Sequence, residues 1–157
     1  MIKIMFVCHG NICRSTMAEF LMKDYVNRLG QSDKFYIASA GTSSEEQGNP
    51  VHYGTREILR SLNISCAGKF AVKLKVDDYD KYDYFIGMDA QNLYNMKRIF
   101  GGDKDDKIKK LLDFSSRPRD VFDPYWTGDF QATYKDVSEG IKAFYEFLTE
   151  KNGNRKK

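Results

Sequence analysis

The sequence has 157 residues, of which 41% are hydrophobic and 30% are charged, and its formal net charge is +3. This length and composition predict one globular domain with its own hydrophobic core, and they exclude a disordered chain. The charge is mild and forms no basic stripe with interleaved aromatic residues, so we expect no nucleic-acid partner.

The cellular location is predicted from three features. No apolar run approaches the roughly 18 residues of a membrane span, and residues 1–7 are too short for a signal-peptide core. The chain has three cysteines, an odd and small number that is not typical of a secreted disulfide framework. We therefore expect a cytoplasmic protein. Residues 1–150 are expected to form the single domain, and the basic residues 151–157 a frayed, solvated tail.

Four apolar runs of strand length predict buried strands, at Ile2–Val7, Phe35–Ser39, Tyr84–Met88 and Ile108–Leu112. A helical pattern follows most of these runs. Strands that alternate with helices indicate a parallel sheet covered on both faces, a three-layer α/β/α fold. In such sheets ligands bind beyond the carboxyl ends of the strands, which directs attention to residues 8–14.

The helices are predicted from their start and stop signals. Thr16 and Glu19 have the spacing of a capping box, with Ser15 as a competing cap, and Gly30 supplies a stop. Later helices are expected from Asn49 to about Leu62, after Asp89, and over Phe130–Thr149, in the last case because apolar residues recur at helical spacing.

The segment that joins the first strand to the first helix, here called the Cys8 loop (residues 8–15), is suited to hold an anion. Such a loop turns several backbone N–H groups and a helix N-terminus toward one small space. Gly10 and Asn11 are residue types that tolerate the backbone angles of a tight wrap. Arg14 adds a planar, permanently charged fork that can hold two phosphate oxygens.

Cys8 places a thiol in this positive environment. Helix N-termini and nearby cations lower a thiol pKa from about 8.5 to about 3.5–7.5, so we expect a thiolate at neutral pH. A tetrahedral oxyanion held above it would be attacked in line at phosphorus, which predicts a phosphocysteine intermediate. Ser15 is close enough in sequence to donate a hydrogen bond to the sulfur when it leaves in the second step.

A phosphate ester also needs an acid that protonates its leaving oxygen. We predict that Asp123 is this acid, and then the base for the water that splits phosphocysteine. Pro124 keeps Asp123 out of helical geometry and stiffens the segment. Tyr125 and Trp126 beside it are expected to form the wall of a slot for an aromatic ring.

Cys8, Arg14 and Ser15 near the start of the chain, combined with the Asp-Pro-Tyr of residues 123–125, resemble the low-molecular-weight protein tyrosine phosphatases. A Cys-x5-Arg motif alone also occurs in unrelated proteins, but its combination with a distant Asp-Pro-Tyr is specific. The resemblance covers nearly the whole chain, and further segments match in the same order at residues 39–42, 48–50, 82–84 and 88–92. It implies a four-stranded parallel sheet, no metal or cofactor, and a phosphotyrosine protein or small aryl phosphate as substrate, with inorganic phosphate as product.

The resemblance also implies roles for single residues. The loop residues expected to surround the phosphate are His9, Gly10, Asn11, Ile12, Cys13 and Ser15. Asn11, Ser39 and Asp89 are expected to brace the loop. Cys13 is either a buried small residue or, as in the family, a redox partner that forms a reversible disulfide with Cys8. His9 and His52 have no ligand-spaced partners, so we expect no metal site.

Two positions depart from the family pattern. Lys69 stands where the family often has a histidine of the bracing network, which predicts a rewired network. Glu45 lies nearest the position of an aromatic slot wall, which predicts an acidic or open wall and a lower preference for substrates with acidic flanks.

Three alternatives remain open from the sequence. A thiol-dependent arsenate reductase shares the fold and the loop motif, but it needs two further, closely spaced cysteines where this chain has Cys66 alone. A second alternative is a phosphotyrosine-binding module or redox sensor without catalysis. The third concerns the substrate, since phosphoarginine would fit similar machinery and Glu45 leaves that option open.

Overall fold

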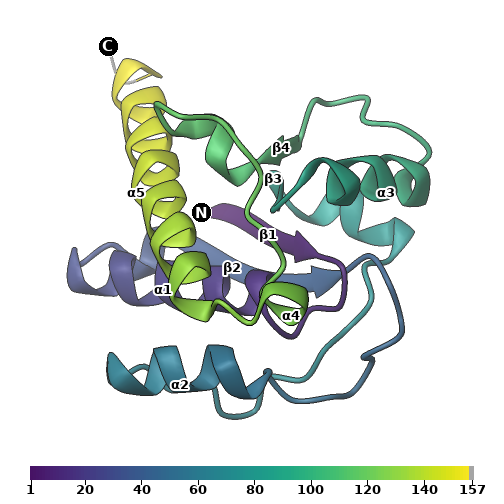
Figure 1. Ribbon diagram of the computed structural model, residues 1–157. Helices are drawn as coiled ribbons and strands as arrows, with labels where there is room; N and C mark the ends of the chain where they lie inside the picture. Colours follow the sequence, from purple (N-terminus) through teal and green to yellow (C-terminus); the bar gives the residue numbers. More distant parts are fainter. Residues whose placement is uncertain (156–157) are drawn as a thin grey trace.

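The fold is organised around one parallel sheet (Figure 1). The computed structural model describes the backbone of residues 1–155 and the side chains of residues 1–150. Within this part of the chain the sheet has four strands in the order β2-β1-β3-β4, and each adjacent pair is parallel. The strands are β1 (Ile2–Cys8), β2 (Phe35–Gly41), β3 (Tyr84–Gly87) and β4 (Ile108–Lys110). The predicted parallel sheet is confirmed.

Helices cover both faces of the sheet, so the predicted three layers are confirmed as well. The helices are α1 (Arg14–Arg28), α2 (Tyr53–Ser61), α3 (Ala90–Phe100), α4 (Pro124–Thr127) and α5 (Phe130–Arg155). Three 3₁₀ turns, η1 (Ser32–Lys34), η2 (Val76–Lys81) and η3 (Leu111–Phe114), complete the regular structure of the described residues. Figure 1 shows α1 and α5 on one side of the sheet and α3 on the other.

The alternation of side chains along β1 explains the two faces. Ile4, Phe6 and Cys8 belong to the core that includes residues of α1, α2 and α5. Met5 and Val7 belong to the core on the α3 side. Because successive strand residues point to opposite faces, a central strand buried on both sides reads as a continuous apolar run. The same alternation places Cys8 on the α1 side, at the carboxyl end of the strand.

The predicted N-cap of the first helix, Thr16, is wrong by three residues, because the observed N-cap is Cys13. The helix begins at Arg14, because the backbone of the Cys8 loop already enters helical geometry after Cys13. The Thr16 hydroxyl donates to the Cys13 carbonyl at 3.0 Å and therefore does not act as an N-cap. Glu19 bonds to partners outside the helix terminus instead of closing a capping box.

The predicted start of the second helix is also wrong, by four residues. Residues 48–50 pair with residues 70–71 as an isolated antiparallel bridge, with Ala71 N–H bonded to the Asn49 carbonyl at 2.8 Å. An extended, paired backbone cannot belong to a helix, so α2 begins only at Tyr53. His52 is its N-cap, and its Nδ1 accepts from Gly54 N–H at 3.0 Å.

The remaining boundaries follow the prediction more closely. Asp89 caps α3 as expected, and its carboxylate accepts from Asn92 N–H at 2.8 Å. β4 is shorter than predicted, because Leu111 and Leu112 fold into η3 while staying buried. The last helix continues past Thr149 to Arg155. The predicted frayed tail over residues 151–157 falls on residues whose side chains lie outside the described part, and it stays a prediction.

None of the described helices is both long and apolar enough to cross a bilayer.

Candidate active site

The Cys8 loop connects the carboxyl end of β1 to the first turn of α1, at the edge of the sheet that the sequence indicated. Asn11 adopts a left-handed backbone conformation with φ of 60°, as its residue type predicted. Gly10, which was expected to share this conformation, does not adopt a positive φ. Its small size matters for a different reason, since a Cβ there would approach Cγ of Glu46 to 3.2 Å.

Asn11 fixes the shape of the loop from inside the protein. Its side-chain Nδ2 donates to Ser15 Oγ and to Ser39 Oγ, both at 2.9 Å, and its Oδ1 accepts from Val72 N–H at 3.0 Å. The residue is buried, so these bonds are formed away from water, where an unmade bond would be costly. The structure therefore brings Asn11 and Ser39 together as predicted.

Cys8 lies at the base of the loop with 3% of its surface exposed. Its Sγ is 3.0 Å from Ser15 Oγ, and Ser15 comes from the first turn of α1. Because Asn11 Nδ2 already donates to this Ser15 oxygen, the hydroxyl hydrogen is available for the sulfur. This arrangement suits a hydroxyl that stabilises negative charge on sulfur.

The N-terminus of α1 faces the same region without a side-chain cap. Cys13 occupies the cap position and makes no capping hydrogen bond with its side chain. The first N–H groups of a helix need partners from outside the helix, and they attract anions. An uncapped helix start beside a thiol therefore offers donors to an anion.

Arg14 is the most buried charged residue of the site, with 2% of its surface exposed. Its Nη1 donates to Asp89 at 2.6 Å and to the Val121 carbonyl at 2.9 Å. Its Nη2 lies 3.5 Å from an Asp123 oxygen. Among the described residues its Nε finds no hydrogen-bond partner although it is buried. The protein thus fixes the guanidinium through Nη1, while the N–H of Nε is available to donate to a ligand.

Asp89 is held in place by the start of α3, which explains how it can orient Arg14. One of its oxygens accepts from Asn92 N–H, and the Asn92 side-chain oxygen accepts from Asp89 N–H at 3.1 Å. Burial lowers the Arg14 pKa, but the nearby Cys8, Asp89 and Asp123 raise it, and the resulting pKa lies above its ordinary value. The guanidinium is therefore charged at every pH at which the protein would work.

Asp123 reaches the site from the opposite side of the opening, on the segment between Val121 and α5. It caps the short helix α4, and its Oδ1 accepts from Tyr125 N–H at 3.1 Å. Pro124 occupies the first helical position and is buried, and Asp123 before it has an extended, non-helical backbone as predicted. Asp123 itself is only partly buried, which leaves its carboxyl accessible from the opening.

Tyr125 and Trp126 flank this carboxyl and are both exposed, Trp126 to 81%. Their rings meet edge to face with centroids 5.1 Å apart. Exposed aromatic rings beside a pocket are suited to contact an apolar ligand surface. Glu45 lies on the other side of the opening, where its carboxylate is 3.4 Å from His9 Nε2.

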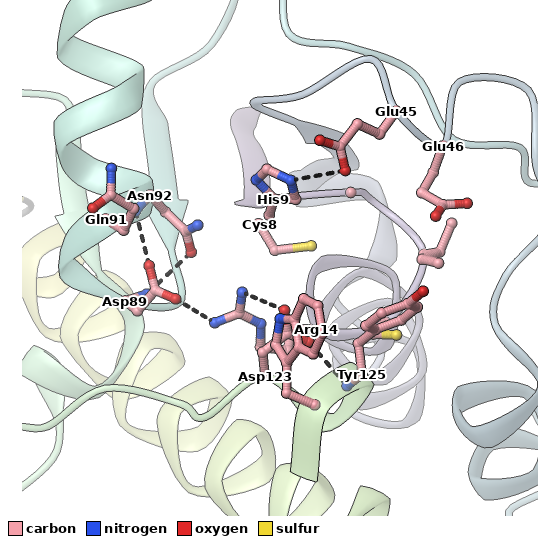
Figure 2. Close-up of a pocket in the computed structure, with 14 residues that line it drawn as sticks. Cys8, His9, Arg14, Glu45, Glu46, Asp89, Gln91, Asn92, Asp123 and Tyr125 are labelled. Carbon is pink, nitrogen blue, oxygen red and sulfur yellow. Dashed lines mark hydrogen bonds and ion pairs between the residues drawn. The ribbon is translucent and has the colours of Figure 1, made fainter. Parts of the chain in front are cut away.

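The loop, Arg14 and the Asp123 segment surround a cavity of about 500 Å³ (Figure 2). Figure 2 shows the Cys8 sulfur and the Arg14 guanidinium turned toward the same space, with His9 and Glu45 beside it. Predicted site residues that line the cavity are Cys8, His9, Gly10, Ile12, Cys13, Arg14, Glu45, Asp89, Asp123, Tyr125 and Trp126. Those that do not line it are Asn11, Ser15, Ser39 and Lys69, of which the first three are buried in the network behind the loop. Three further residues line the cavity that were not predicted from the sequence, which are Glu46, Gln91 and Asn92.

Cys13 also lines the cavity, but its thiol is buried and its pKa differs from that of an exposed thiol. Burial, together with the nearby Cys8 and Asp123, raises its pKa to about 12. Cys13 is therefore a neutral thiol at physiological pH. Cys8, Cys13 and Cys66 are all free.

Glu19 lies in the network behind the Cys8 loop and does not form the capping box that the sequence predicted. It is 4% exposed and accepts from Ser39 Oγ at 2.5 Å and from Lys23 at 2.6 Å. Lys69 lies 3.7 Å from it and donates to the Ser39 carbonyl at 2.8 Å. The network behind the loop is thus built around a lysine–glutamate pair. The available signal was the four-residue spacing of Ser15 and Glu19, which places both on one face of α1.

Gly41 is a second residue whose role the sequence left open. A Cβ at this position would lie 2.7 Å from the His9 carbonyl oxygen and 3.2 Å from Asn11 N. The end of β2 therefore supports the Cys8 loop through direct backbone contact, which only glycine permits.

Comparison with known proteins decides the family. The model of the family described as low molecular weight phosphotyrosine protein phosphatase matches residues 3–154. The chain belongs to this family. It is 42% identical over 144 residues to the low molecular weight protein-tyrosine-phosphatase YfkJ of Bacillus subtilis, covering 90% of this chain and 92% of that protein.

Solved structures of similar proteins agree with this assignment. The crystal structure of YfkJ has a TM-score of 0.91 and covers 96% of both chains. The low molecular weight protein tyrosine phosphatase SP-PTP of Streptococcus pyogenes has a TM-score of 0.85 at 40% identity, covering 94% of this chain and 93% of that one. A drosophila arginine phosphatase, DARP, has a TM-score of 0.85 at 26% identity, covering 94% and 98%.

The phosphatase family consists of cysteine-based enzymes, and the chain is accordingly a protein-tyrosine-phosphatase. Within the part of the chain that the structure describes, no group of three or more His, Cys, Asp or Glu side chains is arranged to hold a metal ion.

Proposed function

We propose that the enzyme hydrolyses phosphotyrosine monoesters through a phosphocysteine on Cys8, with Arg14 as the phosphate clamp and Asp123 as general acid and base. The observation that carries the proposal is the buried Nε of Arg14, which has no hydrogen-bond partner in the part of the chain that the structure describes, while the other edge of the same guanidinium is bonded to Asp89 and Val121. A buried donor without a partner is costly, and a phosphate oxygen would satisfy it. The uncapped start of α1 supplies further donors beside the Cys8 sulfur.

In the first step, the Cys8 thiolate attacks phosphorus and a sulfur–phosphorus bond forms. The bond from phosphorus to the phenolic oxygen breaks, and the Asp123 carboxylic acid gives its proton to that oxygen. The Nη2 of Arg14 lies 3.5 Å from the Asp123 carboxylate. The Arg14 guanidinium is expected to stabilise the negative charge that develops on the equatorial phosphate oxygens.

In the second step, the Asp123 carboxylate takes a proton from water, and the resulting oxygen attacks phosphorus. The sulfur–phosphorus bond breaks, inorganic phosphate is released, and the electron pair returns to sulfur. Ser15 Oγ, 3.0 Å from Sγ, donates a hydrogen bond to the departing thiolate. This bond favours the charged form of sulfur and hence its departure.

The substrate ring is expected to lie between Tyr125 and Trp126 on one side and the 43–46 segment on the other. Glu45 is exposed and its carboxylate lies 3.4 Å from His9 Nε2, while Glu46 accepts from the Asn49 side-chain amide at 2.6 Å. Two carboxylates at the mouth of a pocket for a phosphate dianion would repel acidic substrates. We infer a preference for phosphotyrosine segments with neutral or basic flanking residues.

The same carboxylates favour phosphoarginine as a second candidate substrate. Its guanidinium portion is cationic, and a carboxylate can bind a guanidinium through two hydrogen bonds. The drosophila relative is named an arginine phosphatase. Turnover of a phosphoarginine peptide and of a phosphotyrosine peptide with the same flanks separates the two candidates, with phosphotyrosine expected to be the faster substrate because of the aromatic wall.

The cytoplasm remains the location we propose, because three free thiols fit a reducing compartment. The arsenate-reductase and binding-module alternatives are less well supported. The family assignment favours a phosphatase, and Asp123 lines the cavity where an acid for ester cleavage is needed.

The proposal is tested by the turnover of p-nitrophenyl phosphate by two site variants. Cys8→Ser should have no measurable turnover, and Asp123→Ala should lose about 10²–10⁴-fold in kcat, the usual contribution of a general acid. Cys66→Ser and Asp113→Asn are matched controls outside the cavity and should retain wild-type rates. Substantial turnover by Cys8→Ser, or a wild-type rate for Asp123→Ala, would overturn the assignment.

A further inference from the structure

His52 lies where α2 meets the Cys8 loop, and it has no part in the two reaction steps described above. It is the N-cap of α2, and its backbone N–H donates to the Ile12 carbonyl of the Cys8 loop at 2.9 Å. Thr55, one turn further along α2, donates through its hydroxyl to the Cys13 carbonyl at 3.0 Å. The first turn of α2 is therefore bonded at two points to the loop that holds Cys8.

The His52 side chain contacts the other half of the site. Its ring stacks on Phe130 with centroids 5.1 Å apart and an angle of 18° between the planes. The same ring meets Tyr125 edge to face at 6.2 Å. Its Nδ1 accepts from Gly54 N–H, which fixes the orientation of the ring. One side chain thus connects α2 both to α4 and to the first residue of α5.

The Asp123 segment (residues 121–130) is held in its middle by the buried Pro124 and by the ion pair of Asp123 with Arg14 at 3.5 Å, and the His52 contacts add a hold at its far end. Its first residue, Val121, is tied down by the Arg14 Nη1 donor and by a bond from its own N–H to the Met88 carbonyl at 2.9 Å. Its far end is Phe130, which packs against Ile12 and Cys13 of the loop. Between these two anchors, Phe122, Tyr125 and Trp126 are exposed.

The packing at the far anchor is tight. A Cβ on Gly54 would lie 2.4 Å from two ring atoms of Phe130, so the ring rests directly on the backbone of α2. The position of Phe130, and with it the end of the Asp123 segment, is defined by α2 and by the His52 ring.

We propose that His52 is a positioning residue for the general acid: its ring, held between Phe130 and Tyr125, fixes α4 so that the Asp123 carboxyl stays over the Cys8 loop. The inference rests on the proposed role of Asp123. A small displacement of a catalytic group can lower its contribution by about 10²-fold. A loosened α4 would therefore weaken protonation of the leaving group while leaving Cys8 and Arg14 in place.

Two substitutions separate the ring from the cap. His52→Asn keeps a side-chain acceptor at the N-cap and removes the ring, whereas His52→Phe keeps a ring and removes the acceptor. The reaction readout is kcat/KM for phenyl phosphate relative to p-nitrophenyl phosphate. Phenol is a poor leaving group that needs the acid, while p-nitrophenol is a better one that needs it less. The stability readout is the midpoint of urea unfolding.

We expect a crossed pattern. His52→Asn should lower the ratio of phenyl to p-nitrophenyl phosphate turnover by about tenfold, a fraction of the full 10²–10⁴ of an acid, with little change in the unfolding midpoint. His52→Phe should lower the midpoint and keep the ratio within about twofold of wild type, since an aromatic contact survives. A wild-type ratio for His52→Asn, or a larger change of ratio in His52→Phe than in His52→Asn, would overturn the proposal.

A second observable is independent of turnover. Trp126 is the chain's single tryptophan and lies on α4, so its fluorescence anisotropy reports the motion of this helix. His52→Asn should lower the anisotropy, and an unchanged value would contradict the proposal. Should His52→Asn fail to fold, Gly54→Ala keeps His52 and displaces Phe130, and it should lower the same ratio.

Asp123→Asn, measured in parallel, distinguishes the two levels of the inference. If this variant has the leaving-group dependence of wild type, Asp123 is not the acid and the proposed function itself is wrong. If it has a steep dependence while His52→Asn does not, Asp123 is the acid and only the positioning role of His52 is refuted.

Discussion

Substitution of Glu19 should lower the free energy of unfolding more than substitution of Lys69, although the two residues form one buried pair. Among the side chains of residues 1–150, Glu19 has three partners, which are Lys23 at 2.6 Å, the Ser39 hydroxyl at 2.5 Å and Lys69 at 3.7 Å. Within the same residues Lys69 has two partners, which are Glu19 and the Ser39 carbonyl at 2.8 Å. Burial lowers the Lys69 pKa, and Glu19 opposes that shift.

Removal of Lys69 leaves Glu19 compensated by Lys23, so Lys69→Met should lose mainly the hydrogen bond from a charged donor to Ser39. Such a bond contributes about 1.5–3 kcal/mol to the free energy of unfolding. Glu19→Gln instead leaves a lysine whose side chain is 15% exposed without its counter-charge. Breaking a buried pair in this way costs about 3–5 kcal/mol.

Urea unfolding at neutral pH measures both free energies. We predict that Glu19→Gln is more destabilising than Lys69→Met, and that the double variant loses less than the sum of the two because the partners are coupled. Lys23→Met is the control, since its side chain is 45% exposed and the pair with Glu19 is close to solvent. A Lys69→Met variant that is as destabilised as Glu19→Gln, or strict additivity in the double variant, would refute the reasoning.

Three further predictions concern the clamp, the pH dependence of stability and the second cysteine. In Arg14→Lys, one ammonium group can bond either to Asp89 and Val121 or to the phosphate, but not to both. The variant should therefore lose two charge-assisted hydrogen bonds, which is about 3–6 kcal/mol or about 10²–10⁴-fold in kcat/KM for p-nitrophenyl phosphate. A loss below about tenfold would contradict the role of Arg14 as the phosphate clamp. Hydrogen bonds from Arg119 and then Ser115 lower the Glu139 pKa from 4.5 to about 2, so its contribution to stability is present above pH 4.5 and is lost as the pH falls toward 2. Urea midpoints across this range should fall less steeply in Glu139→Gln, and equal slopes would be the contrary result. Burial, Cys8 and Asp123 raise the Cys13 pKa to about 12, so the Cys13 thiol should not react with iodoacetamide at neutral pH. Peptide mass spectrometry of the treated native protein should find no label on Cys13. Rapid labelling of Cys13 would contradict this raised pKa.

The strands and the cap at Asp89 were predictable because their signals are local. A buried strand needs only a short apolar run, and a capping residue needs only the next three residues of the chain. The helix starts at Thr16 and Asn49 were mispredicted because distant partners decided them. Residues 48–50 pair with residues 70–71, and Glu19 bonds to Ser39 across 20 positions.

The candidate site divides in the same way. Cys8, Arg14 and Asp123 were predicted because each residue type has a defined chemical task at its position in the motif. The residues that hold them were harder to find, because their partners lie far away in the sequence. His52 and Phe130 are 78 positions apart and meet only because α2 and α5 pack on the same side of the sheet. No spacing rule on a single sequence reports such a contact.

The formation of a phosphocysteine on Cys8 is tested most directly by trapping it. Wild type and Asp123→Asn are mixed with p-nitrophenyl phosphate, quenched in acid within the first turnovers, digested and analysed by mass spectrometry. We predict a single phosphate adduct on Cys8 and none in Cys8→Ser. An adduct on His9 or Cys13, or phosphate release by Cys8→Ser at the wild-type rate, would contradict the central claim.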